Sequence, residues 1–229
     1  MSTNSTAARD SKRKTATTAR KTSRAEGKTS ARASDSTRSR RSQTVARRGA
    51  TRKTTSEQKS LSDLLEHALK DIYYAEKKIY RALPKMIKKA DHPELKKALE
   101  AHREETAGQI ETLETVFELM GKRARGEKCE AIDGILEEGE SLLEDFGDSV
   151  AADAAIIFSC QAVEHYEITR YGSIRAFADA LGLDQVRDHI DGILAQEKTA
   201  DQTLNTLAEG SVNDAAAEYD EAEDEEMAG

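Results

Sequence analysis

The sequence predicts an all-α protein that folds as an antiparallel four-helix bundle. Its 229 residues include only two prolines and 4% aromatic residues, and they are rich in Ala, Leu, Glu and Lys, which favours helices over strands. Apolar residues recur at alternating spacings of three and four over four long stretches, and this period indicates amphipathic helices. Two short turns and one long link separate the stretches, so two helical hairpins are expected.

The two ends of the chain differ from its middle. Residues 1–59 contain 17 Lys and Arg against 4 acidic residues, a net charge of +13, and the remaining residues carry −21. After Met1, residues up to 57 hold Val45 as their one large apolar side chain, so a disordered basic arm is predicted over 1–57. An acidic disordered tail is predicted over 211–229 on the same grounds. The bundle itself is therefore expected over residues 58–210.

The first hairpin is expected to join a helix from Ser60 to Ala90 with a second that runs to Met120 and is ended by Gly121. Pro84 is a place where the first helix is expected to kink. The core stripe predicted for the first helix is Leu65, Leu69, Ile72, Glu76, Ile79 and Leu83. The stripe predicted for the second is Leu95, Ala98, His102, Glu105, Gln109 and Val116.

The second hairpin is expected to join a helix from Asp148 to Gly182 with one from Asp184 to Glu209. The stripe predicted for the third helix is Ile156, Cys160, Val163, Glu167, Arg170, Ile174, Phe177 and Leu181. The stripe predicted for the fourth is Val186, Ile190, Ile193, Glu197, Ala200, Leu204 and Leu207. The link at 122–147 contains a short helical pattern at 128–145 and is long enough to cross the bundle. Two hairpins joined by one long crossover is the ferritin-like connection.

Each long helix carries an acidic residue on its predicted core stripe: Glu76, Glu105, Glu167 and Glu197. At about 1.5 Å per residue, all four lie about 21–24 Å from the turn of their own hairpin. If the crossover places the two turns at opposite ends, the four carboxylates meet near the middle. Three further polar residues, His102, Glu164 and Asp201, would then form a layer just beyond them.

This arrangement predicts a site for two metal ions. Four carboxylates in a bundle core repel one another and lose hydration, which costs several kcal/mol per ion unless cations neutralise them. Carboxylates with an imidazole suit iron or manganese, and we expect iron first and manganese as the alternative. The predicted metal ligands are Glu76, His102, Glu105, Glu164, Glu167, Glu197 and Asp201.

Several separated motifs occur in an order that resembles the YciE/YciF-type ferritin-like family. They are "DIYYAEKKI" (71–79), "AHREET" (101–106), "KCEAI" (128–132), "VEHYEI" (163–168) and "QEKTAD" (196–201). The resemblance covers about residues 60–210. It implies a dimetal carboxylate bundle with ferroxidase activity that is cytoplasmic, often dimeric and associated with stress responses. The chain departs from the Glu-x-x-His order of the wider ferritin-like group, because it has His102-x-x-Glu105 in one helix and Glu197-x-x-x-Asp201 in another.

Simpler readings remain open for several residues. A single glutamate near a core stripe usually lies at the edge of the core. These four are favoured as metal ligands because all of them lie at about the same distance from the turn of their own hairpin. His165 is expected to face outward, Asp71 is either a partner of the site or a solvated acid, and Tyr73, Tyr80 and Tyr171 are expected to pack in the core or at its rim. Arg170 is expected to neutralise a nearby carboxylate, and Cys160 to be a small buried hydrophobe. Cys129 lies in the link and allows a redox role.

Three functions compete at this point. The first is a dimetal protein that oxidises Fe(II) with dioxygen or peroxide as a stress-protection step, with its arm expected to hold it on DNA through non-specific phosphate contacts. The second is a non-enzymatic, architectural nucleic-acid-binding protein that uses the bundle to form a homodimer. The third is a metal-binding or stress scaffold without turnover. The alternative for the arm is a solubilising tail. No apolar run approaches the ~18 residues of a membrane span. The two cysteines do not form a disulfide framework, so a cytoplasmic or nucleoid location is expected.

Overall fold

The computed structural model describes residues 58–219. These residues form five α-helices and one π-helical turn, and they contain no strand, so the predicted all-α class is confirmed. The predictions of a disordered arm over 1–57 and of a disordered tail over 220–229 lie outside the described residues. Within the described part of the chain, no helix combines the length and the apolar character that a membrane crossing requires.

The first hairpin consists of α1 (Leu61–Lys89) and α2 (Pro93–Leu119). Ser60 caps α1, because its hydroxyl accepts from the backbone N–H of Asp63 at 3.1 Å while the Asp63 carboxylate accepts from the backbone N–H of Ser60 at 2.7 Å. Helix α1 continues through the exposed Pro84. Gly121 follows α2 with φ of 65°, a left-handed conformation that favours glycine at a helix end.

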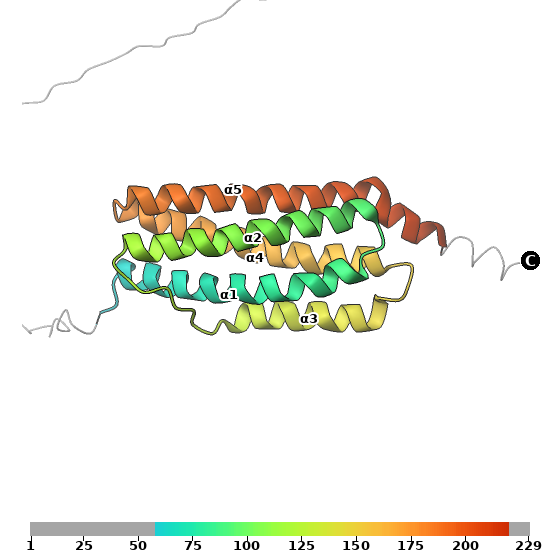
Figure 1. Ribbon diagram of the computed structural model, residues 1–229, viewed down its shortest axis with the longest axis horizontal. Helices are drawn as coiled ribbons and strands as arrows, with labels where there is room; N and C mark the ends of the chain where they lie inside the picture. The colour runs from blue at the N-terminus through green and yellow to red at the C-terminus, as the bar shows by residue number, and fades with distance from the viewer. Residues whose placement is uncertain (1–57, 220–229) are drawn as a thin grey trace, which may run out of the picture. The chain divides into compact units, whose positions relative to one another are not determined.

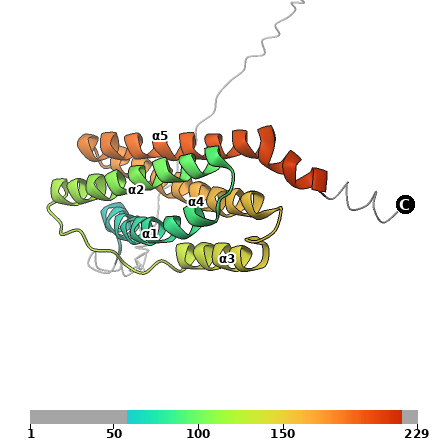
Figure 2. The ribbon, with the colours of Figure 1, turned by 45° about the vertical axis from the view of Figure 1, so that its right-hand side comes forward.

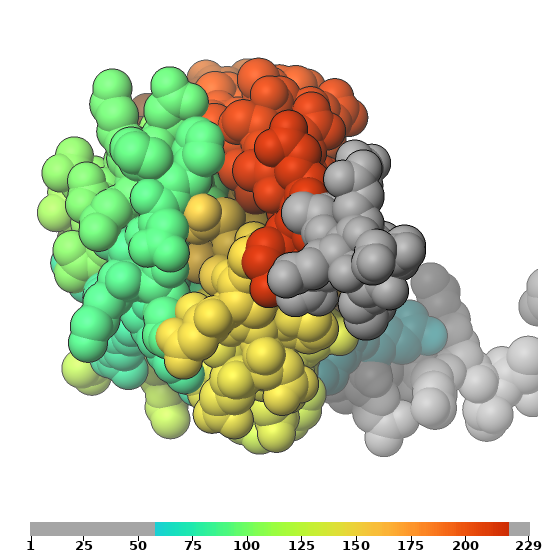
Figure 3. Space-filling model, turned by 90° about the vertical axis from the view of Figure 1, so that its right-hand side faces the viewer, coloured from blue at the N-terminus to red at the C-terminus, as the bar shows by residue number. Residues whose placement is uncertain are grey.

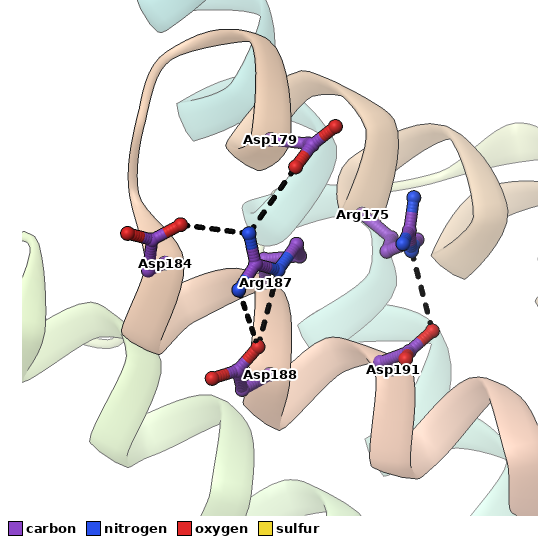
Figure 4. Close-up of polar contacts among 6 residues, drawn as sticks. All are labelled: Arg175, Asp179, Asp184, Arg187, Asp188 and Asp191. Carbon is purple, nitrogen blue, oxygen red and sulfur yellow. Dashed lines mark hydrogen bonds and ion pairs between the residues drawn. The ribbon is translucent and has the colours of Figure 1, made fainter.

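The second hairpin consists of α4 (Ala152–Ala180) and α5 (Asp184–Leu207). Gly182 has φ of 68° and begins its turn. Arg187 holds this turn by donating to Asp184 at 2.7 Å and to Asp188 at 2.8 Å, and Asp179 lies 3.3 Å from the same guanidinium (Figure 4). The three carboxylates come from both helices, so this cluster fixes how α4 leads into α5.

The two hairpin turns lie at opposite ends of the bundle (Figure 1). The backbone N–H groups of Asp91 and His92, in the turn between α1 and α2, donate to the Asp153 carboxylate near the start of α4 at 3.0 and 2.9 Å. At the same end, His92 Nε2 lies 3.1 Å from the Ser211 hydroxyl, which belongs to the π-helical turn η1 (Ala208–Val212) after α5. This is the crossed arrangement in which acidic residues of both hairpins can meet.

The long link contains helix α3 (Glu130–Phe146), which packs outside the four long helices against α4 and α1 (Figure 2). Ile132 and Leu143 of α3 join the common core. Viewed from the end that holds the α1–α2 turn, α3 lies beside the first hairpin and below α5 (Figure 3). The predicted crossover is therefore present.

The helical structure extends beyond the predicted end of the bundle. After η1 the chain remains helical to residue 219, and Val212 is buried against the core. Residues 211–219 thus differ from the disordered tail predicted for them, because one apolar residue and the Ser211–His92 contact attach this segment to the α1–α2 turn.

Candidate metal centre

Five buried side chains that could bind metal ions meet in the middle of the bundle. Each of the four long helices contributes at least one, and every one is at most 7% exposed. They are Glu76 of α1, His102 of α2, Glu164 and Glu167 of α4, and Glu197 of α5. One possible ligand atom from each of His102, Glu164, Glu167 and Glu197 lies within 4.8 Å of all the others. Four of the five are carboxyl groups buried from solvent.

The helical period explains why these polar residues lie inside. Glu76 occupies the core stripe of α1 between Ile72 and Ile79, both at most 2% exposed. Glu197 has the same place on α5, between Ile193 and the buried Leu204. Apolar layers above and below therefore separate the carboxyl groups from solvent and hold their helices in register.

Two neutral donors orient two of the carboxyl groups. The hydroxyl of Tyr171 on α4 donates to Oε1 of Glu76 on α1 in a short hydrogen bond. Gln109 Nε2 on α2 donates to Oε1 of Glu197 on α5, and also to Oε1 of Gln196 at 3.1 Å. His102 Nε2 lies 3.3 Å from Oε1 of Glu164. These contacts connect α1 with α4, and α2 with both α4 and α5.

The remaining polar atoms of the cluster have no hydrogen-bond partner. They are Oε2 of Glu76, Oε2 of Glu164, both carboxyl oxygens of Glu167, Oε2 of Glu197 and Nδ1 of His102. Buried polar atoms are normally paired, because an unpaired one loses its hydration without compensation. Six such atoms in one place therefore indicate a site for cations. The donors, several carboxylate oxygens and one imidazole nitrogen, are ligands that divalent metal ions take in proteins.

Without cations, the carboxyl groups hold protons. Burial is the main cause that raises the pKa of Glu76 to about 8 and of Glu164 to about 10, and the charge of Glu197 adds to both. Burial also raises the pKa of Glu197 to about 7 and that of Glu167 well above its usual range. Burial lowers the pKa of His102 to about 4, so its imidazole is neutral and able to bind metal.

The structure brings together five of the seven residues predicted as ligands and places the other two at the edge. Glu105 is exposed, and the expectation that it lies on the core stripe of α2 is wrong, because Thr106 occupies that position with 1% exposure. Asp201 is about one quarter exposed and pairs with His165 Nε2 at 3.2 Å. Gln161 Nε2 also donates to Asp201 at 3.2 Å. His165 itself faces outward, as predicted, with 69% of its side chain exposed.

The site also includes Tyr171 and Gln109, to which the sequence patterns assign no role. The patterns predict only that Tyr171 packs in the core or at its rim and that Gln109 lies on the core stripe of α2. The available signal was their spacing: Tyr171 follows Glu167 by four residues, and Gln109 follows His102 by seven, so each faces the same side of its helix as a ligand.

A second polar network lies beside the cluster without joining it. The Tyr166 hydroxyl donates to Asp71 Oδ2 at 3.2 Å and lies 3.2 Å from the Cys129 thiol. Arg170 is the cation paired with Asp71, at 3.6 Å. Asp71 is therefore satisfied by this network, and Arg170 neutralises Asp71, not a member of the cluster. Cys160 is buried, and burial raises its pKa to about 12.

Comparison with known proteins agrees with the motifs. Residues 60–217 match the family described as "Domain of unknown function (DUF892)". The chain belongs to this family. It is 37% identical over 156 residues to protein YciF of Escherichia coli (strain K12), covering 68% of this chain and 94% of that protein. The predicted resemblance to the YciF-type family is thus confirmed.

Two solved structures of relatives share the fold. The crystal structure of the E. coli stress protein YciF superposes with a TM-score of 0.65 at 37% identity, covering 68% of this chain and 99% of that one. YcfI from Rhodopseudomonas palustris, described as a candidate structural protein, gives a TM-score of 0.65 at 44% identity and covers 67% of this chain and 98% of its own. The similarity spans the bundle and leaves the basic arm outside it.

Proposed function

We propose that this chain is a dimetal carboxylate protein that binds two Fe(II) ions and oxidises them with dioxygen or peroxide as a protective step under stress. The observation that carries the proposal is the group of unpartnered, buried ligand atoms contributed by all four long helices. Four carboxylates carry the charge that two divalent cations balance, so loading would offset the burial and the mutual repulsion that otherwise keep these groups protonated.

Each residue would have a distinct task in this reaction. Glu167 would offer two unpartnered oxygens to the ions, and Glu76, Glu164 and Glu197 would each offer one. His102 would supply the nitrogen donor, and its Nε2 lies 3.3 Å from Oε1 of Glu164. Tyr171 and Gln109 hold the second oxygen of Glu76 and of Glu197, which fixes the orientation of both carboxylates. Bound Fe(II) would supply the electrons that reduce the oxidant. Manganese is the alternative metal.

Iron oxidation can be tested directly. Fe(II) added without oxygen and then exposed to air or peroxide should give a ferric absorbance change that saturates at two irons per chain. Glu167→Gln should abolish the change while the helical circular dichroism is kept, because the amide keeps the shape and removes the charge. Glu104→Gln, which removes an exposed charge on α2 outside the cluster, is the matched control and should behave as the unmodified protein. A protein that gives no ferric signal, or a Glu167→Gln variant that keeps it, would refute the proposal.

The cellular setting forms part of the same proposal. The stress-protein description of YciF supports a protective role. The net charge of +13 in residues 1–59 supports non-specific contact with DNA, which would hold the reaction beside the nucleoid in the cytoplasm. A homodimer of the bundle would place two such arms on one particle.

The second candidate function is a non-enzymatic, architectural nucleic-acid-binding protein that uses the bundle as a dimerisation module. The basic arm and the description of YcfI favour it. Gel retention of duplex DNA by the full chain and by a chain lacking residues 1–57 tests the arm. We expect retention by the full chain alone, falling steeply with added salt. Equal retention by both chains would exclude a role for the arm, and retention without any iron oxidation would favour this second function.

A further inference from the structure

Two cavities reach the metal cluster from different sides of the bundle, and both end at His102 and Glu164. The first is about 20 Å³ and lies between α1, α3 and α4. Its other walls are mainly apolar and include Ile79, Leu136 and Val163. Apart from His102 and Glu164, only Ser159 and Cys160 among the described lining residues could offer a hydroxyl or a thiol there, and the hydrocarbon side chains that form most of the wall cannot coordinate a cation that has lost its water.

The second cavity is about 130 Å³ and lies between α2 and α5. Its inner end holds His102 and Glu164, which are 7% and 1% exposed, and each has an unpartnered atom. Its outer part includes Glu105, whose carboxylate is exposed to solvent. Acidic and imidazole groups thus extend from the surface to the buried cluster along one passage.

The walls of this second cavity suit a cation. Ala98, Ala101 and Ala200 leave the space between the helices unfilled, and no Lys or Arg is among the lining residues that the structure describes. Thr199 and Thr203 also line it. Their hydroxyls donate to the carbonyl oxygens of Ala195 and Thr199 at 2.9 and 2.8 Å, so the hydroxyl oxygens keep lone pairs for a passing ion.

Glu105 is connected to the buried site through this cavity, because Glu105 and the buried Glu164 both line it. A cation held at Glu105 would therefore lie in the same opening as a carboxyl group of the cluster. Glu105 is too exposed to be a ligand of the buried site, but at this position it can attract cations to the opening.

We propose that divalent cations reach the cluster through the opening between α2 and α5, where Glu105 is the first carboxylate they meet and from which they pass to His102 and Glu164. The inference rests on the proposed function, since it concerns how the same site is loaded. Glu105 acts here as an access residue that speeds loading and does not contribute to the final affinity.

The test measures the rate of loading separately from binding at equilibrium. Co(II) alone is mixed with the metal-free full chain, its visible absorbance is followed by stopped flow, and the bound metal is counted by equilibrium dialysis. Ala101→Phe places a ring at the exposed rim of the opening, and Ala195→Phe is its control, an exposed alanine on α5 that does not line the cavity. Glu105→Gln removes the carboxylate, and Glu104→Gln removes an adjacent charge that does not line the cavity.

We expect loading to slow about tenfold in Ala101→Phe, and about three- to tenfold in Glu105→Gln at low salt, since a charge at a cleft mouth concentrates counter-ions there. Both variants should still bind two Co(II) per chain, and both controls should load at the unmodified rate. Loading at the control rate in both variants would overturn the inference. Loss of bound metal at equilibrium in Glu105→Gln would overturn it too, because Glu105 would then be a ligand. If the unmodified chain binds no metal, the proposed function itself fails.

Discussion

The hydroxyl of Tyr171 fixes the orientation of the Glu76 carboxyl group. Oε1 of Glu76 accepts from Tyr171, whereas Oε2 accepts from no such donor. Oε2 is thus the atom that would be open to a cation once the group is ionised. Gln109 has the same effect on Glu197, where it occupies Oε1 and leaves Oε2 unpaired. Two neutral donors therefore hold two carboxyl groups in the orientation that metal binding requires.

Replacing Tyr171 with phenylalanine should weaken metal binding without changing the fold. The variant keeps the buried ring but leaves Oε1 of Glu76 free to turn away, and loss of such an orienting partner typically lowers metal affinity about 10- to 100-fold. Equilibrium dialysis with Mn(II) measures the affinity. Tyr166→Phe is the matched control, because Tyr166 is on the same helix and its hydroxyl contacts Asp71 and Cys129 outside the cluster. Equal affinities for the two variants would exclude the orienting role of Tyr171.

Helix α2 shows where prediction from the sequence succeeded and where it could not. The apolar stripes of α1, α4 and α5 pass through Glu76, Glu167 and Glu197 and predicted their burial correctly. In α2, no large apolar residue on the stripe lies between Leu99 and Leu113, so the register after His102 could advance by three or by four. It advances by four to Thr106, whose hydroxyl donates to the carbonyl oxygen of His102 at 2.9 Å and so needs no other partner.

Contacts between helices that are far apart in the sequence were the other part that could not be predicted. Tyr171 and Glu76 are 95 residues apart, and their hydrogen bond depends on the position of α4 along the axis of α1. The crossover was predictable from the length of the link. That the two hairpin turns lie at opposite ends of the bundle was a condition, because nothing in the sequence required it. The Asp153 contacts to the α1–α2 turn now satisfy that condition. The extension to residue 219 was missed because Ser211 and Val212 resemble tail composition.

Over the whole chain, charge is divided between a basic arm and an acidic body. Residues 60–229 carry a net charge of −21, which repels nucleic acid and attracts divalent cations toward the bundle. The arm, with its positive charge, is the part suited to phosphate contacts. One chain thus combines an acidic body with a segment of opposite charge, so deletion of residues 1–57 would test the proposed DNA contact separately from the proposed metal binding.

The same buried charges predict how stability depends on pH. The pKa values of Glu76, Glu164 and Glu197 rise from 4.5 to about 8, 10 and 7 in the folded protein. Between pH 4.5 and those values the folded state keeps protons that the unfolded state has lost, so stability falls as pH rises through this window. The pKa of His102 falls from 6.5 to about 4, so its own contribution to stability falls as pH drops from 6.5 toward 4. The three carboxyl groups outweigh the one imidazole, so the metal-free protein should lose stability steadily as pH rises from about 4.5 toward 9.

Metal should reverse the alkaline part of this dependence, because a cation stabilises the ionised carboxylates that protons otherwise neutralise. With a chelator present, the melting temperature should fall between pH 6 and 9, and with Mn(II) it should stay level, so the stabilisation by metal grows with pH. Binding should also release protons into a weakly buffered solution at pH 7. Glu167→Gln, which has no charge to lose at this position, should show a shallower fall in chelator. Parallel melting curves with and without Mn(II), or binding without proton release, would show that these carboxyl groups do not hold the metal.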